Sequence, residues 1–466
     1  MRIIFVVLND NSYDPHNSSI RINLMKAFLK KLLPKPLLNF YYKSLSMIAA
    51  WFYRYPSEKM IVIGVTGTNG KSTTCNLITR VLEAEGYKVG LTSTVNFKIA
   101  NKEWLNDKKM TMLGRFQLQK LLKKMVNAGC RYAVVETSSE GIKQYRHYGI
   151  NYDYAVFTNL TPEHIESHGS FDNYKSAKRE LFKHLTKREQ KFLHEKLILK
   201  TSIINIDDEH ADYYAEVPAD NKLFFSVDGQ NVNATIAHDV RVSLGGTSFK
   251  IDNEEINLKL IGEFNVYNAL PAIIIGKQEG IDIAMIKKGL EGVEVVPGRM
   301  EFIKEGQDFF VFVDYAPEPA SLEWMYKTIN KIKKEELSVS RIIHVLGSCG
   351  GGRDKARRPV LGAMAADNAD IVIVTNEDPY DENPSDIIDQ VADGALKHGK
   401  ELGKSLFKII DREQAIEKAL SLAEKDDLVI VTGKGSEQAM ALAKGDYIKW
   451  DDRVIIRNYL KTKKLV

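Results

Sequence analysis

The stretch Ile61–Thr74 (IVIGVTGTNGKSTT) constrains this chain more than any other. Apolar β-forming residues lead into a glycine-rich turn, and a lysine and three hydroxyl residues then open a helix. Gly67 and Gly70 allow the backbone N–H groups to turn inward, which suits a phosphate. Lys71 can reach the terminal phosphates, and the Ser72 hydroxyl can ligate Mg²⁺ at the positive helix N-terminus. We therefore expect a phosphate site in a strand–turn–helix unit, and not a glycine turn that binds nothing.

Length and composition narrow the class of protein. A chain of 466 residues is too long for one hydrophobic core, so two or three domains are expected. The 65 basic and 61 acidic residues nearly balance, which gives no case for nucleic acid as a partner. Cys75, Cys130 and Cys349 lie far apart and form no C-x-x-C motif. A disulfide framework or zinc site is therefore not expected, and a reducing cytoplasm fits best.

Strand-like runs alternate with helical stretches over most of the chain. From residue 60 to 160 the runs IVIGVTG, KVGLTST, YAVVETSS and YAVFTNL are separated by helices expected at Ser72–Glu85 and Phe116–Ala128. This alternation predicts an α/β fold with a doubly wound parallel sheet, whose ligands bind at the carboxyl ends of the strands. Short strands with turn residues at 203–260 predict a small antiparallel layer, and a helix is expected at Asn265–Gln278.

The segment Val295–Arg299 (VVPGR) has the character of a domain boundary. After it a second alternating series begins, with FFVFVDYA, RIIHVLGS, DIVIVTNE and DDLVIVTGKG as strands of a second, Rossmann-like α/β sheet. We therefore predict a short helical N-terminal region at 1–57, a central ATP-binding domain at 58–297 and a C-terminal domain at 298–466.

The N-terminal region contains an apolar patch, Phe40–Tyr53, that includes Lys43. The patch is too short to span a bilayer, so it is either a helix packed on the next domain, the favoured interpretation, or an interfacial helix on a membrane. Met25 offers an alternative start of the chain, which leaves open whether residues 1–24 are translated or ordered.

Several groups that bind metals follow the predicted strands. Glu136 ends the third strand, where it would face the phosphate turn and hold Mg²⁺ together with Ser72. His164 and His168 follow the next strand, and beside a carboxylate at least one of them is a credible ligand. Lys178 lies in an amphipathic helical stretch, where a lysine is normally solvated.

Nine blocks of the sequence together resemble the Mur ligase family, most closely its MurE type. In the family's order they are GVTGTNGKST, ETSSEGIKQYR, VFTNLTPEHIESHG, YKSAKRELF, GEFNVYNAL, VVPGRMEFI, VDYAPEPASLE, GGGRDKARRP and TGKGSE. The resemblance runs from about Ile61 to the C-terminus.

The resemblance implies a role for each residue that matches a family motif. ATP would contact the glycine turn and four later residues: Gly67, Thr68, Asn69, Gly70, Lys71, Ser72, Thr73, Asn265, Asn268, Arg299 and Asp314. Two Mg²⁺ ions would be held by Ser72, Glu136, His164 and Lys178, the last as a carbamate formed with CO₂. The catalytic set would be Lys71, Glu136, His164 and Lys178. The sugar-peptide and the amino acid would contact Thr111, Ser138, Ser139, Arg146, Asp378, Tyr380, Gly433 and Glu437.

The implied reaction is ATP-dependent amide formation in peptidoglycan precursor synthesis. The terminal carboxylate of UDP-N-acetylmuramoyl-L-alanyl-D-glutamate attacks the γ-phosphate and gives an acyl phosphate and ADP. The amine of an amino acid (diaminopimelate, lysine or another) then attacks the activated carbonyl. The resemblance implies a cytoplasmic enzyme, and we expect a monomer whose other partners are these small molecules.

The chain departs from the family pattern at several places. Fewer than sixty residues precede the phosphate turn, whereas the family has a uridine-binding domain of about a hundred residues there. Glu140, Pro317 and Ser436 stand where histidines are usual. Diaminopimelate-adding members read Asp-Asn-Pro-Arg where this chain has Glu377-Asp-Pro-Tyr380, so the second carboxylate of diaminopimelate loses its arginine. Lysine or another amino acid is therefore as plausible as diaminopimelate.

Two other functions stay open at this point. A folylpolyglutamate synthase shares the GTNGK turn and also lacks a uridine-binding domain, but the blocks ETSSEGIKQYR, EHIESHG and GGGRDKARRP favour the Mur side. A non-catalytic Mur-like subunit would explain the lost histidines. The retained Lys71, Glu136, His164, Lys178 and Arg299 argue against it, because a scaffold has no physical need for a two-metal phosphate site.

Overall fold

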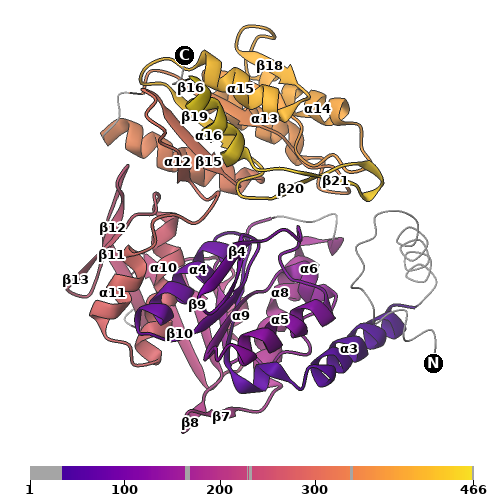
Figure 1. Ribbon diagram of the computed structural model, residues 1–466, viewed down its shortest axis with the longest axis vertical. Coiled ribbons are helices and arrows are strands. Elements are labelled where there is room, and N and C mark those ends of the chain that lie inside the picture. Colours follow the sequence, from indigo (N-terminus) through magenta and orange to yellow (C-terminus); the bar gives the residue numbers. More distant parts are fainter. Residues whose placement is uncertain (1–33, 163–167, 228, 230–232, 336–338, 464–466) are drawn as a thin grey trace.

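The computed structural model describes residues 34–162, 168–227, 229, 233–335 and 339–463. The expectations for residues 1–24 and for His164 lie outside these ranges. The molecule consists of two sheets, each with its own helices, which follow one another along its long axis. The earlier part of the chain lies below the later part in Figure 1. Within the described ranges, every helix is too short or too polar to cross a membrane.

The first sheet has eleven strands in the order β13-β12-β11-β10-β9-β6-β1-β5-β2-β3-β4. Their bounds are β1 Ile61–Thr66, β2 Val89–Thr92, β3 Asn96–Ile99, β4 Lys102–Leu105, β5 Tyr132–Glu136, β6 Tyr154–Phe157, β9 Thr201–Asn205, β10 Asn221–Val227, β11 Ala234–Ser243, β12 Gly246–Ile251 and β13 Glu254–Leu258. The phosphate-turn strand β1 lies at the centre, parallel to β5 and β6.

The prediction of a separate antiparallel layer at 203–260 is wrong in part. Strands β9, β10 and β11 continue the main sheet in parallel, and only β11, β12 and β13 pair antiparallel. The short turn-rich strands of this segment suggested hairpins, but sequence alone gave no register to show that the first of them extend the main sheet. A second antiparallel edge, β2-β3-β4, was not expected.

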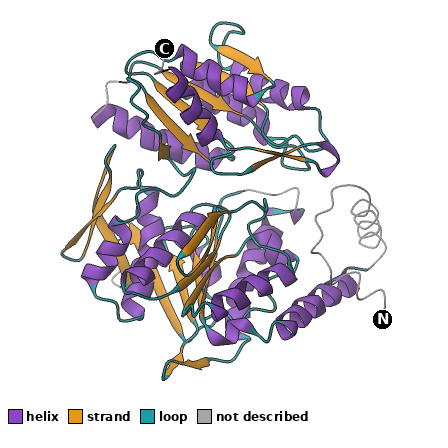
Figure 2. Cartoon of the chain, viewed as in Figure 1, coloured by secondary structure: helices purple, strands orange, loops and turns teal. Residues whose placement is uncertain are grey.

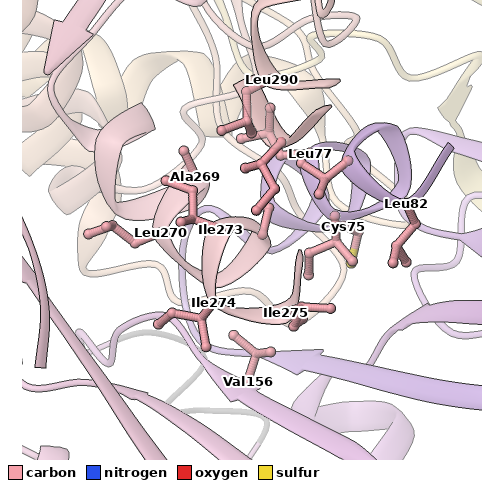
Figure 3. Packing of buried hydrophobic residues seen from close by; sticks show 14 of the residues in the cluster. Cys75, Leu77, Leu82, Val156, Ala269, Leu270, Ile273, Ile274, Ile275 and Leu290 are labelled. Carbon is pink, nitrogen blue, oxygen red and sulfur yellow. The ribbon is translucent and has the colours of Figure 1, made fainter. Parts of the chain in front are cut away.

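Helices cover both faces of this sheet. On one face lie α4 (Lys71–Ala84), α10 (Phe264–Gln278) and α11 (Ile283–Glu291), and on the other α5 (Arg115–Asn127) and α8 (Phe171–Thr186). Side chains of α4 and α10 interdigitate above β6, as Figure 3 shows for Cys75, Leu77, Ile273, Ile274 and Val156. Helix α10 is buried almost all round, so it holds α4 rigidly behind the phosphate turn.

The second sheet has six strands in the order β14-β15-β19-β16-β17-β18. Figure 2 shows its strands in orange among purple helices in the upper part of the molecule. Its strands and helices are β14 Glu301–Phe302, β15 Phe310–Asp314, α12 Pro319–Glu335, β16 Ile342–Leu346, α13 Arg357–Asn368, β17 Ile371–Thr375, α14 Pro384–Lys397, β18 Leu406–Ile409, α15 Arg412–Leu422, β19 Leu428–Thr432 and α16 Asp452–Lys463. Strands β15, β16, β17, β18 and β19 are all parallel, as an α/β fold requires. The sequence had predicted four of them, and β18 was not among them.

Small elements complete the described chain. They are the 3₁₀ turns Pro56–Lys59 and Ala443–Gly445, helices α6 (Ser139–Lys143) and α9 (Ala211–Ala215), and the hairpins β7 Lys191–Leu193 with β8 Lys196–Ile198 and β20 Ala439–Ala441 with β21 Tyr447–Lys449. The division of the chain into domains at 57 and 297 stays a prediction. The linker passes close to the C-terminal sheet: Gly298 has φ +64°, and a Cβ there would lie 2.1 Å from the Ser436 nitrogen.

The N-terminal region contributes helix α3 (Lys35–Phe52). Its buried residues are Ser46, Ala49 and Ala50, and it packs against α5, which agrees with the favoured interpretation of Phe40–Tyr53. The opposite face of α3 is exposed and apolar. Its largest exposed side chains, with the one that follows the helix, are Leu37, Phe40, Tyr41, Ile48, Trp51, Phe52 and Tyr55.

Candidate active site

A cavity of about 410 Å³ lies between the two sheets. It is lined by the glycine turn and strand ends of the central region and by residues 314–325 and 349–357 of the C-terminal region. We call it the nucleotide cavity. Its position at the carboxyl ends of parallel strands is where α/β folds bind ligands.

The glycine turn is shaped by one close approach. Gly70 has φ +80°, and a Cβ at this position would lie 2.1 Å from Asn268 Oδ1, so no larger residue fits. Lys71 opens α4, and its Nζ donates to the Thr68 carbonyl oxygen at 2.6 Å. The turn thus presents the N-terminus of a fourteen-residue helix and a lysine to the cavity, the arrangement that binds phosphate oxygens.

Glu136, at the end of β5, is buried beside this turn. Its Oε2 accepts hydrogen bonds from Ser72 Oγ at 2.8 Å and from the Thr94 N–H at 2.7 Å, and its Oε1 accepts from Thr94 Oγ1 at 2.8 Å. The Glu136 carboxylate and the Ser72 hydroxyl are hard oxygen donors in contact with each other, which fits the ligand preference of Mg²⁺. The structure therefore brings together the two residues predicted to hold the first metal ion.

Lys178 on α8 is not a solvated helix residue. Only 1% of it is exposed, and its Nζ donates to the Gly67 carbonyl oxygen at 2.5 Å. The amine also lies 4.3 Å from the centre of the Tyr174 ring and lines the nucleotide cavity. His168 is buried, and burial together with Lys143 lowers its pKa, so the neutral imidazole is favoured.

The other residues predicted to contact ATP fall into two groups. Asn268 lines the cavity, whereas Asn265 supports it from behind by accepting a hydrogen bond from Asn268 Nδ2 at 3.0 Å. Arg299 and Asp314 line the cavity from the other side. Burial raises the pKa of Asp314, while Arg299 and the backbone N–H groups of Met300 and Ala316 oppose that rise.

The residues predicted to hold the sugar-peptide lie at one end of the nucleotide cavity. Thr111, Ser138 and Ser139 line it, and Ser138 caps α6 by accepting from the Gly141 N–H at 3.2 Å. Arg146 does not line the cavity. Its guanidinium donates to the Met112 carbonyl oxygen and, at 2.8 Å, to Gln144 Oε1.

The four C-terminal residues predicted to contact substrate line a second, smaller cavity of about 90 Å³. These are Asp378, Tyr380, Gly433 and Glu437. We call this the amino-acid cavity. The two cavities share a wall made of Thr94, Thr111, Tyr315, Cys349 and Arg353.

Sequence analysis missed several groups in the amino-acid cavity. Lys434 is fully buried, and its Nζ donates to both oxygens of Asp378 at 3.0 and 3.1 Å and to Glu437 Oε2 at 2.5 Å. Burial alone would raise the pKa of Asp378, but Lys434 and Lys109 lower it, so the carboxylate stays ionised. The block TGKGSE contains Lys434 and could have indicated it.

Cys349 and Glu377 line the amino-acid cavity beside Asp378. Cys349 Sγ donates to Glu377 Oε1 at 2.8 Å, and one ligand atom from each of Cys349, Glu377 and Asp378 lies within 4.8 Å of the others. Burial first, and then the two carboxylates, raise the thiol pKa well above its usual value, and burial raises the pKa of Glu377. With Lys434 and Lys109 ion-paired to Asp378, this trio is poorly suited to a cation.

Comparison with known proteins decides the family. The Mur ligase middle domain matches residues 65–276, and the Mur ligase, glutamate ligase domain matches residues 298–435. The chain is 34% identical over 427 residues to the UDP-N-acetylmuramoyl-L-alanyl-D-glutamate–2,6-diaminopimelate ligase of Geobacillus kaustophilus, covering 90% of this chain and 83% of that protein. The chain belongs to the Mur ligase family. It is also 37% identical to a UDP-N-acetylmuramyl-tripeptide synthetase of a Roseiflexus species, with 90% and 82% covered.

Solved structures of Mur ligases share the fold. A UDP-N-acetylmuramoyl-L-alanyl-D-glutamate–2,6-diaminopimelate ligase superposes with a TM-score of 0.59 at 29% identity, covering 91% of this chain and 83% of the other. The folylpolyglutamate synthase of Mycobacterium tuberculosis complexed with ADP gives a TM-score of 0.65 with 95% and 97% covered, but at 16% identity. That second likeness shows a common fold alone, so sequence identity favours the Mur ligases over the rival synthase.

Proposed function

We propose that this Mur ligase joins an amino acid to UDP-N-acetylmuramoyl-L-alanyl-D-glutamate and converts ATP to ADP and phosphate as it does so. The names of its relatives describe the same joining of an amino acid to this acceptor. One observation carries the proposal: a phosphate turn, a carboxylate–hydroxyl pair and a buried lysine share one cavity, which adjoins a second cavity rich in paired charges. Such adjacency is what a reaction needs when a phosphorylated carboxyl group must meet an amine.

The residues would divide the chemistry between the two steps. In the first, the acceptor carboxylate displaces ADP from the γ-phosphorus and becomes an acyl phosphate. Lys71 and Arg299 would stabilise the charge on the transferred phosphoryl group. In the second, the amine attacks the acyl carbon, phosphate leaves, and the amine loses a proton. Mg²⁺, which Ser72 and Glu136 would hold, supplies charge neutralisation at the phosphates.

Lys178 would act as a carbamate. Its neutral amine would attack CO₂, forming an N–C bond and releasing one proton, so that an anionic oxygen replaces a cation beside the metal site. Support comes from burial: a charged ammonium at this depth, close to the Mg²⁺ ligands, would oppose metal binding, whereas a carbamate favours it. His164 remains the predicted additional ligand.

Two arginines of the central region are candidates to contact the uridine diphosphate. Arg146 and Arg115 are neighbouring guanidiniums, and Arg115 lies 4.4 Å from the ring centre of Tyr42 on α3. Burial and then Arg146 lower the pKa of Arg115 to about 10, so a nearby anion would relieve this repulsion. We propose that this pair, behind Met112, faces the diphosphate.

We propose a monomeric, cytoplasmic enzyme that contacts the inner face of a membrane through α3. The exposed apolar side chains of α3 recur at helical spacing on one face, and residues 15–57 contain seven basic and no acidic residues. Aromatic and basic side chains together suit an anionic lipid interface.

In a flotation assay, wild-type protein should rise through a density gradient together with vesicles that contain phosphatidylglycerol. The double variant Phe40→Ser with Trp51→Ser should stay at the bottom of the gradient. Phe192→Ser, an exposed aromatic on β7, serves as the control.

The reaction is tested by offering purified enzyme ATP, Mg²⁺ and UDP-N-acetylmuramoyl-L-alanyl-D-glutamate with each of a panel of amino acids. We expect ADP release that requires both the UDP-linked acceptor and an amino acid. Tetrahydrofolate with glutamate in place of these substrates is the control. ADP release only with the folate pair, or with no acceptor, would contradict the proposed function.

A further inference from the structure

Lys109 belongs to the central region, and its side chain contacts residues of the C-terminal region. It lies between β4 and α5 in the central region, in a loop where its own φ is +49°. Its Nζ forms an ion pair with Asp378 and lies 3.7 Å from Glu437 Oε2, both in the C-terminal region. The side chain is only 10% exposed, and its Nζ lies 5.7 Å from the ring centre of Tyr380. An ammonium from the central region therefore sits within the amino-acid cavity.

The charges of this cavity explain why a cation sits there. On the C-terminal side, the carboxylates of Asp378 and Glu437 both accept hydrogen bonds from Lys434 Nζ, so these two anions share one ammonium. Among the other described lining residues, Asp107 pairs with Lys108 at 3.0 Å, Arg353 lies on the wall shared with the nucleotide cavity, and burial raises the pKa of Glu377. Lys109 supplies the cation that the remaining carboxylate charge requires.

We propose that Lys109 occupies the place of the side-chain ammonium of the incoming amino acid, and that this amino acid displaces it. The substrate class is then an amino acid with a terminal primary amine and no second carboxylate, such as lysine or ornithine. Arg353, on the shared wall, would pair with the α-carboxylate. This inference rests on the proposed function and adds the identity of the amino acid to it.

The geometry disfavours a substrate with a second carboxylate. Such a group would approach Asp378 and Glu437, and Tyr380 offers no positive charge, because a phenol is neutral, and burial and Asp378 raise its pKa and keep it so. The opposite arrangement would keep Lys109 in place as a substitute for the family's missing arginine, paired with a carboxylate of diaminopimelate. The two arrangements predict opposite effects of removing the Lys109 charge.

Displacement also has an energetic consequence. While Lys109 fills the cavity, only the fraction of molecules with Lys109 withdrawn can bind the amino acid, so the apparent affinity is reduced by that fraction. The same ion pair joins the two halves in the substrate-free enzyme. Lys109 is thus a specificity-determining residue and an interdomain contact at once.

The decisive variant is Lys109→Met, which keeps the length of the side chain and removes its charge. Lys108→Met is the matched control, because Lys108 is its exposed neighbour and forms a surface ion pair with Asp107 at 3.0 Å. With L-lysine, L-ornithine, meso-diaminopimelate and the apolar analogue L-norleucine as amino acids, we expect wild type to use lysine or ornithine. Lys109→Met should lower the KM for that amino acid about threefold to tenfold, and Lys108→Met should not change it. A preference for diaminopimelate that Lys109→Met abolishes would overturn the proposal.

A second measurement does not depend on turnover. Calorimetry should detect L-lysine binding more tightly to Lys109→Met than to wild type, and L-norleucine binding to neither. Hydrogen exchange at residues 106–111 of substrate-free enzyme should be faster in Lys109→Met than in Lys108→Met. Absence of ADP release with every amino acid would contradict the proposed function alone. Unchanged lysine affinity together with unchanged exchange would contradict the role of Lys109, whatever the enzyme's activity.

Discussion

The two cavities differ in where their charged groups come from. In the nucleotide cavity, the Glu136 carboxylate is fixed by Ser72 and Thr94, and Lys178 by Gly67, all within the central region. In the amino-acid cavity, Asp378 and Glu437 are paired with Lys434 of their own region and with Lys109 of the other. In the first cavity the Glu136 and Lys178 side chains are held within one half of the molecule, although the C-terminal region closes the cavity, whereas the charge balance of the second requires both halves.

This difference suits the nucleotide cavity to the phosphate chemistry and the amino-acid cavity to the choice of amino acid. A phosphate site must hold the same groups for every substrate, and a rigid strand-end framework with buried hydrogen bonds achieves that. A site assembled from two halves can change its charge when the halves move apart, which suits the admission of one amino acid among many. Substitutions in the first cavity should therefore affect every amino acid equally, and those in the second should affect some amino acids more than others.

The largest expected effect is that of Lys71→Ala. Loss of the lysine at the phosphate turn should lower kcat by about 10³-fold or more, because charge on the transferred phosphoryl group loses a preorganised partner. The loss should be equal for every amino acid that wild type accepts, as measured by ADP release. Lys88→Ala, on the exposed surface, is the control. A loss that varied with the amino acid would break the distinction between the cavities.

Lys178→Ala should come next, with most activity lost and the affinity for ATP kept. Wild type depleted of bicarbonate at mildly acidic pH should weaken in the same way, because protonation of the amine and scarcity of CO₂ both remove the carbamate. Bicarbonate should restore wild type but not the variant, and Lys183→Ala on the outer side of α8 should behave as wild type. Activity indifferent to both treatments would leave Lys178 a structural residue.

The smallest effect expected is that of Asp378→Asn. Removing one charge of a pair that binds an ammonium should raise the KM for the amino acid about tenfold, in line with a charged hydrogen bond of about 1.5–3 kcal/mol. The KM for ATP should not change. Asp393→Asn, on the exposed side of α14, is the control. An equal rise in both KM values would show that the cavities are coupled and not separate.

Much of the fold could be predicted because parallel strands have a clear pattern. The buried runs at β1, β5, β15 and β19 are continuous apolar stretches bounded by turn residues, and such runs indicate α/β units. The edge strands of the first sheet were harder to predict. Strands β10 and β11 mix buried, half-buried and exposed residues in no regular pattern, so their sequences do not indicate whether they pair in parallel or antiparallel.

The candidate site divides in the same way. Glu136 and the glycine turn were predicted to meet because both follow strands of one sheet, and strand ends converge on one edge. Lys109 could not be found, because its loop has no apolar period and its partners Asp378 and Glu437 lie about 270 and 330 positions later in the chain. Asp378 and Tyr380 were located only through the family resemblance, and the contact between their loop and residue 109 depends on how the two sheets stack.

The wall shared by the two cavities has a practical consequence for inhibition. The residues Thr94, Thr111, Tyr315, Cys349 and Arg353 line the nucleotide cavity on one side and the amino-acid cavity on the other. A small compound seated on that wall would compete with two substrates simultaneously. Resistance by substitution there would have to preserve two binding surfaces, which leaves few tolerated changes.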